Sequence, residues 1–188
     1  DETIVVFTSD HGEMLGDHGI LGKTVLYEES VKVPLLIRVP WLGRHQRPIE
    51  GNLSQVDLVP TLLDLMGQAI PDHLQGQSRL EVMNGQATLS NNDVFIQWNG
   101  SDGHPRPGEG GVNPAMSTPW RSIVSADRWK LNLSAHDQCE LYDLNADPYE
   151  IQNLFDSLEQ RNRVRNLTSR IRAWQIETGD TTTLPEIG

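Results

Sequence analysis

The first 23 residues contain the pattern that most constrains the fold of this chain. Residues 4–7, Ile-Val-Val-Phe, form a short, continuous apolar run of the kind found in strands that are buried on both faces of a parallel sheet. Asp10 and His11 follow at the carboxyl end of this run, where ligands gather in such sheets. The pattern therefore predicts an α/β fold with a functional site at the end of this strand.

Asp10 and His11 are candidate metal ligands. Adjacent side chains of an extended strand point apart, so both can reach one ion only where the backbone turns, and Gly12 permits that turn. Glycines at positions 16, 19 and 22 continue an irregular path to Lys23, whose compact positive charge is suited to an anionic group. An Asp-His-Gly sequence also occurs in simple turns, where the aspartate accepts hydrogen bonds from backbone amides, and the tripeptide alone leaves both interpretations open.

The residues around the tripeptide extend the pattern. Residues 15–19 are Leu-Gly-Asp-His-Gly, residues 22–23 are Gly-Lys, and residues 27–37 run from Tyr-Glu-Glu-Ser into Val-Pro-Leu-Leu-Ile. This order resembles the sulfatases of the alkaline-phosphatase superfamily. The Asp-His version is most similar to the iduronate-2-sulfatase, choline-sulfatase and phosphonate monoester hydrolase branches. Residues 56–67 and 121–154 extend the resemblance over nearly all of the 188 residues.

The resemblance implies the domain organisation. We expect an α/β fold in which a fragment of an alkaline-phosphatase-like sheet is followed by a small C-terminal α+β subdomain, with an antiparallel sheet and a terminal helix. Residues 1–88 would be the C-terminal half of the catalytic domain. Residues 89–188 would be the smaller subdomain.

The resemblance also implies roles for individual residues. Asp10 and His11 would bind a divalent metal; oxygen-rich ligation favours Ca²⁺, and a single imidazole leaves Mg²⁺ or Mn²⁺ open. Lys23 would bind the sulfate group and stabilise charge on its oxygens during catalysis. His18 would either protonate the leaving alcohol or brace the loop, and bracing is the interpretation that we favour.

The nucleophile of the family is not found before the metal motif in this chain. In the family it lies in Cys/Ser-x-Pro-x-Arg, whose Cys or Ser becomes formylglycine, upstream of the Asp-His pair. We therefore expect the chain to be the C-terminal fragment of a longer enzyme and to be inactive alone. Residues 117–121, Ser-Thr-Pro-Trp-Arg, match the motif by letter, but they follow the metal residues and run into predicted strands, so we reject them as the nucleophile.

The predicted activity is that of a metal-dependent sulfuric ester hydrolase, acting on a sulfated small molecule or a sulfated carbohydrate. One alternative is a phosphonate monoester or phosphodiester hydrolase of the same superfamily. Another is a non-catalytic metal-binding or interaction module, since these residues lack the nucleophile. The family implies a periplasmic, extracellular or lysosomal location, and the sequence leaves the oligomeric state open.

Charge and hydropathy limit the partners further. A net charge of −11 argues against a nucleic-acid surface, which needs clustered Lys and Arg. No apolar run approaches the roughly 18 residues that would span a bilayer. An anionic substrate would need local positive charge, for which Lys23 and a bound metal are the candidates.

Hydrophobic periodicity predicts the remaining elements. We expect a short helix or turn over 24–32, and strands over 33–39, 94–98, 120–124, 129–133 and 140–144. Glu28 and Glu29 could line the pocket, but we favour a solvated helix face for them. Helices are expected over 55–66 and 156–177, with residues 181–188 loose. The packing faces predicted for these two helices are Val56, Val59, Leu62, Leu63 and Met66, and Val164, Leu167, Ile171 and Trp174. Asp57 is assigned to the favourable end of the helix dipole.

Residues 99–118 form the least regular stretch, with many glycines and prolines. Such a loop is often a lid or a specificity element, and His104, Arg106 and Trp98 are candidate substrate-binding residues. A surface insertion explains the same composition equally well.

Overall fold

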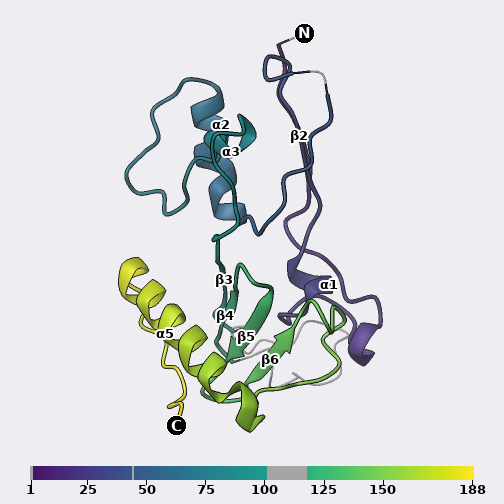
Figure 1. Cartoon of the computed structure of the whole chain (residues 1–188), viewed down its shortest axis with the longest axis vertical. Coiled ribbons are helices and arrows are strands. Elements are labelled where there is room, and N and C mark those ends of the chain that lie inside the picture. Colours follow the sequence, from purple (N-terminus) through teal and green to yellow (C-terminus); the bar gives the residue numbers. More distant parts are fainter. Residues whose placement is uncertain (1, 44, 101–117) are drawn as a thin grey trace, which may run out of the picture.

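The computed structural model describes residues 2–43, 45–100 and 118–188. In chain order the elements are β1 (Val5–Thr8), the 3-10 helix η1 (Asp17–Gly19), α1 (Glu28–Val31), β2 (Leu35–Arg38), the 3-10 helix η2 (Gln55–Asp57), α2 (Leu58–Leu65), α3 (Leu80–Met83), β3 (Val94–Trp98), β4 (Trp120–Val124), β5 (Trp129–Leu133), β6 (Glu140–Asp143), the 3-10 helix η3 (Leu158–Gln160) and α5 (Arg161–Thr178). They form two parts (Figure 1): a two-stranded sheet with α2 and α3, and a four-stranded sheet with α5.

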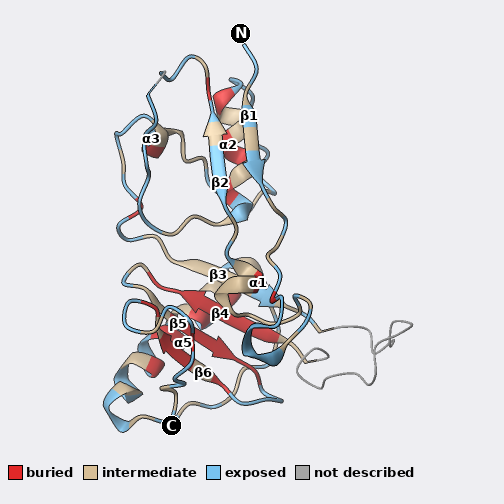
Figure 2. Ribbon diagram, turned by 90° about the vertical axis from the view of Figure 1, so that its right-hand side faces the viewer, coloured by how far each residue is buried: buried red, intermediate tan, exposed pale blue. Residues whose placement is uncertain are grey.

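Strands β1 and β2 pair with each other, but they run antiparallel. Val5 lies opposite Arg38 and Thr8 opposite Leu35. Both strands are largely exposed (Figure 2), with Phe7 62% accessible, so the prediction of a parallel strand buried on both faces is wrong for the described residues. An apolar run indicates that a strand tends to be buried, but it does not identify the segments that would cover the strand. Among the described residues, β2 is the one strand that pairs with β1.

The helix predicted over 55–66 begins as η2 and continues as α2, and Gly67 follows with a left-handed φ of 64°. Its predicted packing face is wrong. Val56, Val59 and Met66 are more than half exposed. The buried residues are Asp57, Pro60, Thr61 and Leu65. The side of the segment that carries Asp57, Thr61 and Asp64 packs instead, because these polar groups bond to residues 77–79.

Asp57 is the N-cap residue of α2, at the end of the helix that the sequence predicts, and its carboxylate also binds residues outside the helix. Its carboxylate accepts hydrogen bonds from the backbone amide of Gln77 (2.9 Å) and from Nε of Arg79 (2.7 Å), and the residue is 3% exposed. The ion pair ties the start of α2 to the segment that leads into α3. Asp57 is therefore a structural residue that joins two segments.

The second half of the chain forms an antiparallel sheet in the order β3-β4-β5-β6, as the sequence predicts for the C-terminal subdomain. Its two faces have different partners. Ile123, Leu131 and Leu141, which lie opposite one another on β4, β5 and β6, belong to the core beneath α5. Val124 and Tyr142 face the other way and pack with Tyr27, from the loop that precedes α1. The sheet is therefore covered on both sides.

Helix α5 covers the first face of this sheet. It begins at Arg161, after η3, rather than at residue 156. Val164, Leu167 and Ile171 are buried as predicted, and Trp174 stacks on Phe95 with ring centroids 5.4 Å apart. Within the described ranges, no helix combines the length and the apolar character that crossing a membrane requires.

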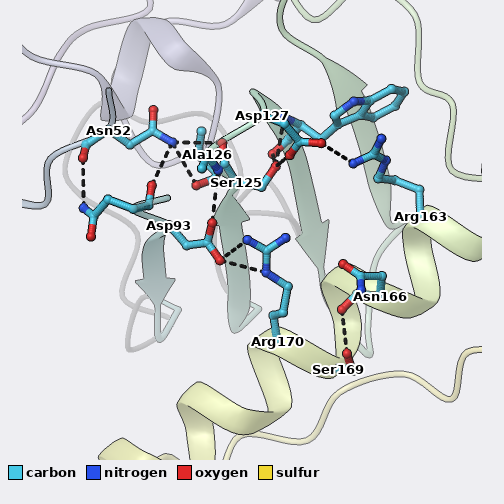
Figure 3. Close-up of polar contacts among 12 residues, drawn as sticks. Asn52, Asp93, Ser125, Ala126, Asp127, Arg163, Asn166, Ser169 and Arg170 are labelled. Atoms are coloured by element: carbon cyan, nitrogen blue, oxygen red, sulfur yellow. Dashed lines mark hydrogen bonds and ion pairs between the residues drawn. The ribbon is translucent and has the colours of Figure 1, made fainter. Parts of the chain in front are cut away.

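Two arginines of α5 attach the helix to the sheet (Figure 3). Arg170 donates to the carboxylate of Asp93, just before β3, with its Nε at 2.7 Å. Arg163 pairs with Asp127, in the β4–β5 turn, and its guanidinium lies 4.7 Å from the centre of the Trp129 ring. These two arginines have structural partners within the subdomain.

The C-terminal tail is held in place, so the prediction that residues 181–188 are loose is wrong. Arg121, which is 2% exposed, donates from Nε and Nη2 to the carboxylate of Asp180 (2.8 and 2.7 Å) and from Nη2 to Oγ1 of Thr182 (2.5 Å). Leu184 and Ile187 pack against the core beneath α5. The tail is short and largely polar, and nothing in its sequence predicted that it would bind a buried arginine.

Candidate functional site

The loop between β1 and α1 folds back on itself. Met14, which is fully buried, donates its amide to the carbonyl of Gly22 (2.9 Å) and anchors the loop. Several loop residues adopt left-handed backbone conformations that permit the tight path: Leu15, Gly16, His18, Gly19 and Gly22. The loop therefore returns Lys23 to the end of β1.

Asp10, His11 and Lys23 lie together at this point. Nζ of Lys23 is 2.5 Å from Nε2 of His11, and Oδ2 of Asp10 is 3.3 Å from the same nitrogen. The side chain of Asp10 is 83% exposed and that of His11 36%, so the group is open to solvent in this chain. The structure thus brings together the three residues to which the sequence assigns metal and sulfate binding.

The hydrogen bonds of His11 indicate its tautomer. Nδ1 is 2.7 Å from the carbonyl oxygen of Gly12. A carbonyl only accepts, so Nδ1 carries the proton and donates, and Nε2 presents a lone pair. Lys23 donates to that lone pair here. The same arrangement, with one ring nitrogen fixed by a backbone carbonyl and the other free to bind, is the one used by metal-binding histidines.

Asp10 is ionised at neutral pH. Desolvation raises its pKa, but backbone amides, the His11 ring and the Ser9 hydroxyl lower it, and the balance lies below the usual 3.8. One carboxylate and one neutral imidazole suit a divalent cation. The described ranges hold no group of three or more His, Cys, Asp or Glu that would form a metal site by themselves.

His18 lies on the far part of the loop and stacks on Tyr27, with ring centroids 3.9 Å apart and planes 6° from parallel. Burial, assisted by Glu140, raises the pKa of Tyr27 to about 12, so its hydroxyl stays protonated and donates to Oε1 of Glu140 (3.2 Å). These contacts brace the loop against β6. Proton donation by His18 to a leaving group stays a prediction.

The predicted substrate-binding residues His104 and Arg106 lie outside the described residues, and Trp98 ends β3. The rejected motif at 117–121 lies partly outside them as well. Its arginine, Arg121, is described: it is buried in β4 and binds Asp180. Because Arg121 is buried and paired with Asp180, its role is to stabilise the fold of the subdomain.

Sequence reasoning missed a buried charge cluster beside α1. Glu28 was predicted on a solvated face, but its side chain is only 12% exposed and lies 3.3 Å from Nζ of Lys130. Lys130 is fully buried in β5 and also pairs with Glu150 at 2.9 Å. A lysine between Trp129 and Leu131 reads as a solvent-facing strand residue, so the sequence carried no signal for the cluster.

Comparison with known proteins identifies the class. The fold of the chain is shared with a sulfatase and with a phosphonate monoester hydrolase, both matched over more than nine tenths of this chain. The family model described as N-sulphoglucosamine sulphohydrolase, C-terminal, matches residues 16–177, and the chain belongs to that family.

Among individual proteins, arylsulfatase K of Mus musculus is 34% identical over 155 residues, which are 81% of this chain and 27% of the relative. A structure described as BT4656 in complex with its substrate D-glucosamine-2-N,6-O-disulfate is 28% identical, with a TM-score of 0.73 over 95% of this chain and 35% of that one. The phosphonate monoester hydrolase of Agrobacterium radiobacter is 27% identical, with a TM-score of 0.76 over 94% and 35%. The chain spans about a third of the length of the curated relatives that it matches.

Proposed function

We propose that this chain contributes part of the active site of a metal-dependent sulfuric ester hydrolase. The observation that supports this proposal is the meeting of Asp10, His11 and Lys23 at the end of β1, in a chain of the sulfatase family. The carboxylate and the imidazole can bind a divalent cation, and Lys23 places a positive charge beside them for a sulfate group.

Each residue would have a distinct task. Asp10 would bind the metal through its carboxylate and His11 through Nε2, while Gly12 holds the imidazole ring through Nδ1. We infer Ca²⁺, with Mg²⁺ or Mn²⁺ as alternatives; when bound, such an ion polarises the ester and favours attack at sulfur. Lys23 would then offset the charge on the sulfate oxygens. The nucleophile, expected to be formylglycine, would come from a part of the complete protein outside this chain.

The substrate would be a sulfated small molecule or a sulfated carbohydrate. One relative of known structure is described with a disulfated glucosamine as its substrate, which supports the carbohydrate class.

The central test uses the complete protein and 4-nitrophenyl sulfate. Lys23→Ala should lower kcat/KM by roughly 10²- to 10³-fold, because it removes a charge that stabilises the transition state. Arg172→Ala is the charge-matched control: this arginine of α5 is 47% exposed and pairs at 3.9 Å with Glu186, which is 97% exposed, so the variant should stay near wild type. Near-normal kcat/KM for Lys23→Ala would overturn the assignment of Lys23.

A second candidate function is phosphonate monoester or phosphodiester hydrolysis. The similarity to the Agrobacterium radiobacter enzyme favours it, because that enzyme shares the fold at a TM-score of 0.76. The ratio of kcat/KM for 4-nitrophenyl sulfate to that for 4-nitrophenyl phenylphosphonate separates the two. A ratio above one supports the sulfatase. Turnover of neither ester by the complete protein would leave a non-catalytic module.

A further inference from the structure

Helix α1 lies beside the C-terminal sheet (Figure 2) and contacts both that sheet, through Glu28 and Lys130, and the loop that carries the proposed site, through Ser30. We propose that the buried cluster of Lys130, Glu28 and Glu150 is a positioning device, which acts through α1 to hold Lys23 and His11 in their working positions. The inference rests on the proposed function for its catalytic consequence. It assigns a task to the C-terminal subdomain, which contributes no residue to the Asp10–His11–Lys23 group.

The site side of α1 is joined to the loop at two points. Ser30, which is 2% exposed, donates from Oγ to the carbonyl of Lys23 (2.6 Å). The carbonyl of Ser30 accepts the amide of Gly12, the residue after His11, at 2.7 Å. One residue of α1 therefore holds both ends of the loop that carries the proposed site.

The approach of the loop to α1 is close. A Cβ placed on Gly12 would lie 1.9 Å from the carbonyl oxygen of Glu29, a distance that no side chain can occupy. The backbone beside His11 thus rests directly on the backbone of α1. Because the two backbone segments are in direct contact, a displacement of α1 would also displace His11 and Lys23.

The opposite side of α1 is held by the C-terminal subdomain. Lys130 contacts Glu150 at 2.9 Å and Glu28 at 3.3 Å. Oε2 of Glu150 accepts the backbone amide of Glu28, the first residue of α1, at 2.6 Å. These three contacts fix both the location of α1 and its rotation.

Burying the charges of this cluster costs desolvation free energy, so the cluster is an inefficient way to stabilise a fold. The side chains of Lys130 and Glu150 are fully buried, and Glu150 has a left-handed φ of 52°, which strains a residue with a Cβ. Apolar residues of similar volume often stabilise an interior equally well or better than buried ion pairs. The hydrogen bonds from the Glu28 amide to Glu150 and from Lys130 to Glu28 are directional, so unlike apolar packing they define one orientation of α1, which is what a catalytic loop requires.

The first experiment measures hydrolysis of 4-nitrophenyl sulfate by the complete protein carrying Lys130→Met. Misplacement of a site residue by about 1 Å can cost on the order of 10²-fold, so we expect kcat/KM to fall roughly 10- to 100-fold. The matched control is Asp180→Asn, which breaks the other buried cation pair of the same sheet, that with Arg121. It should change kcat/KM by less than about twofold, with each variant assayed below the onset of its unfolding.

A double-mutant cycle separates positioning from general destabilisation. If the cluster acts through Lys23, the loss caused by Lys130→Met should shrink in a Lys23→Ala background. Losses that simply multiply would overturn the positioning role. Should Lys130→Met not fold, Glu28→Gln gives the same cycle from the more accessible end of the cluster.

A readout independent of activity keeps the two proposals apart. Backbone amide exchange over residues 12–31 of the complete protein should accelerate in Lys130→Met and stay unchanged in Asp180→Asn. Unchanged exchange in Lys130→Met would overturn the positioning device even if the sulfatase assignment holds. Faster exchange in a protein without sulfatase turnover would support the coupling to the loop and overturn the proposed function alone.

Discussion

Gly12 sets how closely the site loop approaches the rest of the protein. The clash of an added Cβ with the Glu29 carbonyl at 1.9 Å involves backbone atoms on both sides, so neither can move aside cheaply. The glycine at this position allows the backbone of the site loop to contact the backbone of α1 directly.

Gly12→Ala should therefore lower the melting temperature of the complete protein by several degrees and kcat/KM for an aryl sulfate by at least about tenfold. Gly188→Ala is a matched control, because its added Cβ meets nothing within 4 Å. Thermal unfolding and steady-state kinetics measure the two effects. A fully stable and active Gly12→Ala protein would show that the loop does not rest on α1.

Asp10 permits a direct test of metal binding. Asp10→Asn keeps the shape of the side chain and removes its charge, so Ca²⁺ affinity of the complete protein should weaken at least about tenfold. Asp17→Asn, on an exposed residue of the same loop, should bind Ca²⁺ like wild type. Isothermal titration of metal-stripped protein with CaCl₂ gives both values. Equal affinities for the two variants would remove Asp10 from the metal site.

The site residues divide into those that the sequence could predict and those that it could not. Asp10, His11 and Lys23 follow a strand and a glycine-rich loop, so their convergence follows from chain order. The cluster around Lys130 could not be predicted, because strand alternation places a lysine on the open face of a sheet. Here Tyr27 and α1 cover that face, and Glu28 of α1 is about a hundred residues away from Lys130 in sequence.

Among the elements, α5 is the one whose packing the sequence predicted best. Its apolar residues recur on a single stripe within a polar helix, so the pattern had one solution. The buried face of the α2 segment was predicted wrongly, because its polar residues Asp57, Thr61 and Asp64 bond to residues 77–79. The apolar pattern of an element thus predicts its buried face only where no other segment offers partners to its polar residues.

Truncation within α5 tests this packing. Leu167 is fully buried, so Leu167→Ala should lower the free energy of unfolding by about 2–5 kcal/mol. Ile176, on the same helix, is 84% exposed, and Ile176→Ala should change it by less than about 0.5 kcal/mol. Urea unfolding curves of the two variants provide the comparison. Similar values for both would mean that α5 does not pack by this stripe.

At the scale of the whole molecule, the Arg121–Asp180 pair makes stability depend on pH. Hydrogen bonds from Arg121 hold the pKa of Asp180 well below its usual 3.8. Because the folded pKa is depressed, the stabilisation is fully present above the unfolded value and is lost as the pH falls below it.

Asp180→Asn should therefore destabilise the protein at pH 7, and the difference from wild type should narrow as the pH falls below about 4. Chemical unfolding at a series of pH values from 3 to 7 measures this difference. A difference that stays constant over the whole range would show that the carboxylate charge of Asp180 is not its source.

The bond between the amide of Glu28 and the carboxylate of Glu150 also has a consequence for biosynthesis. Its two partners are 122 residues apart in the chain. At about 5–20 residues per second, a ribosome needs roughly 6–24 seconds to add the second partner after the first. The loop bearing Asp10, His11 and Lys23 is therefore synthesised before Glu150, the residue whose carboxylate holds the start of α1. A nascent chain that stops short of residue 150 would carry all three side chains without the complete buried cluster that orients them.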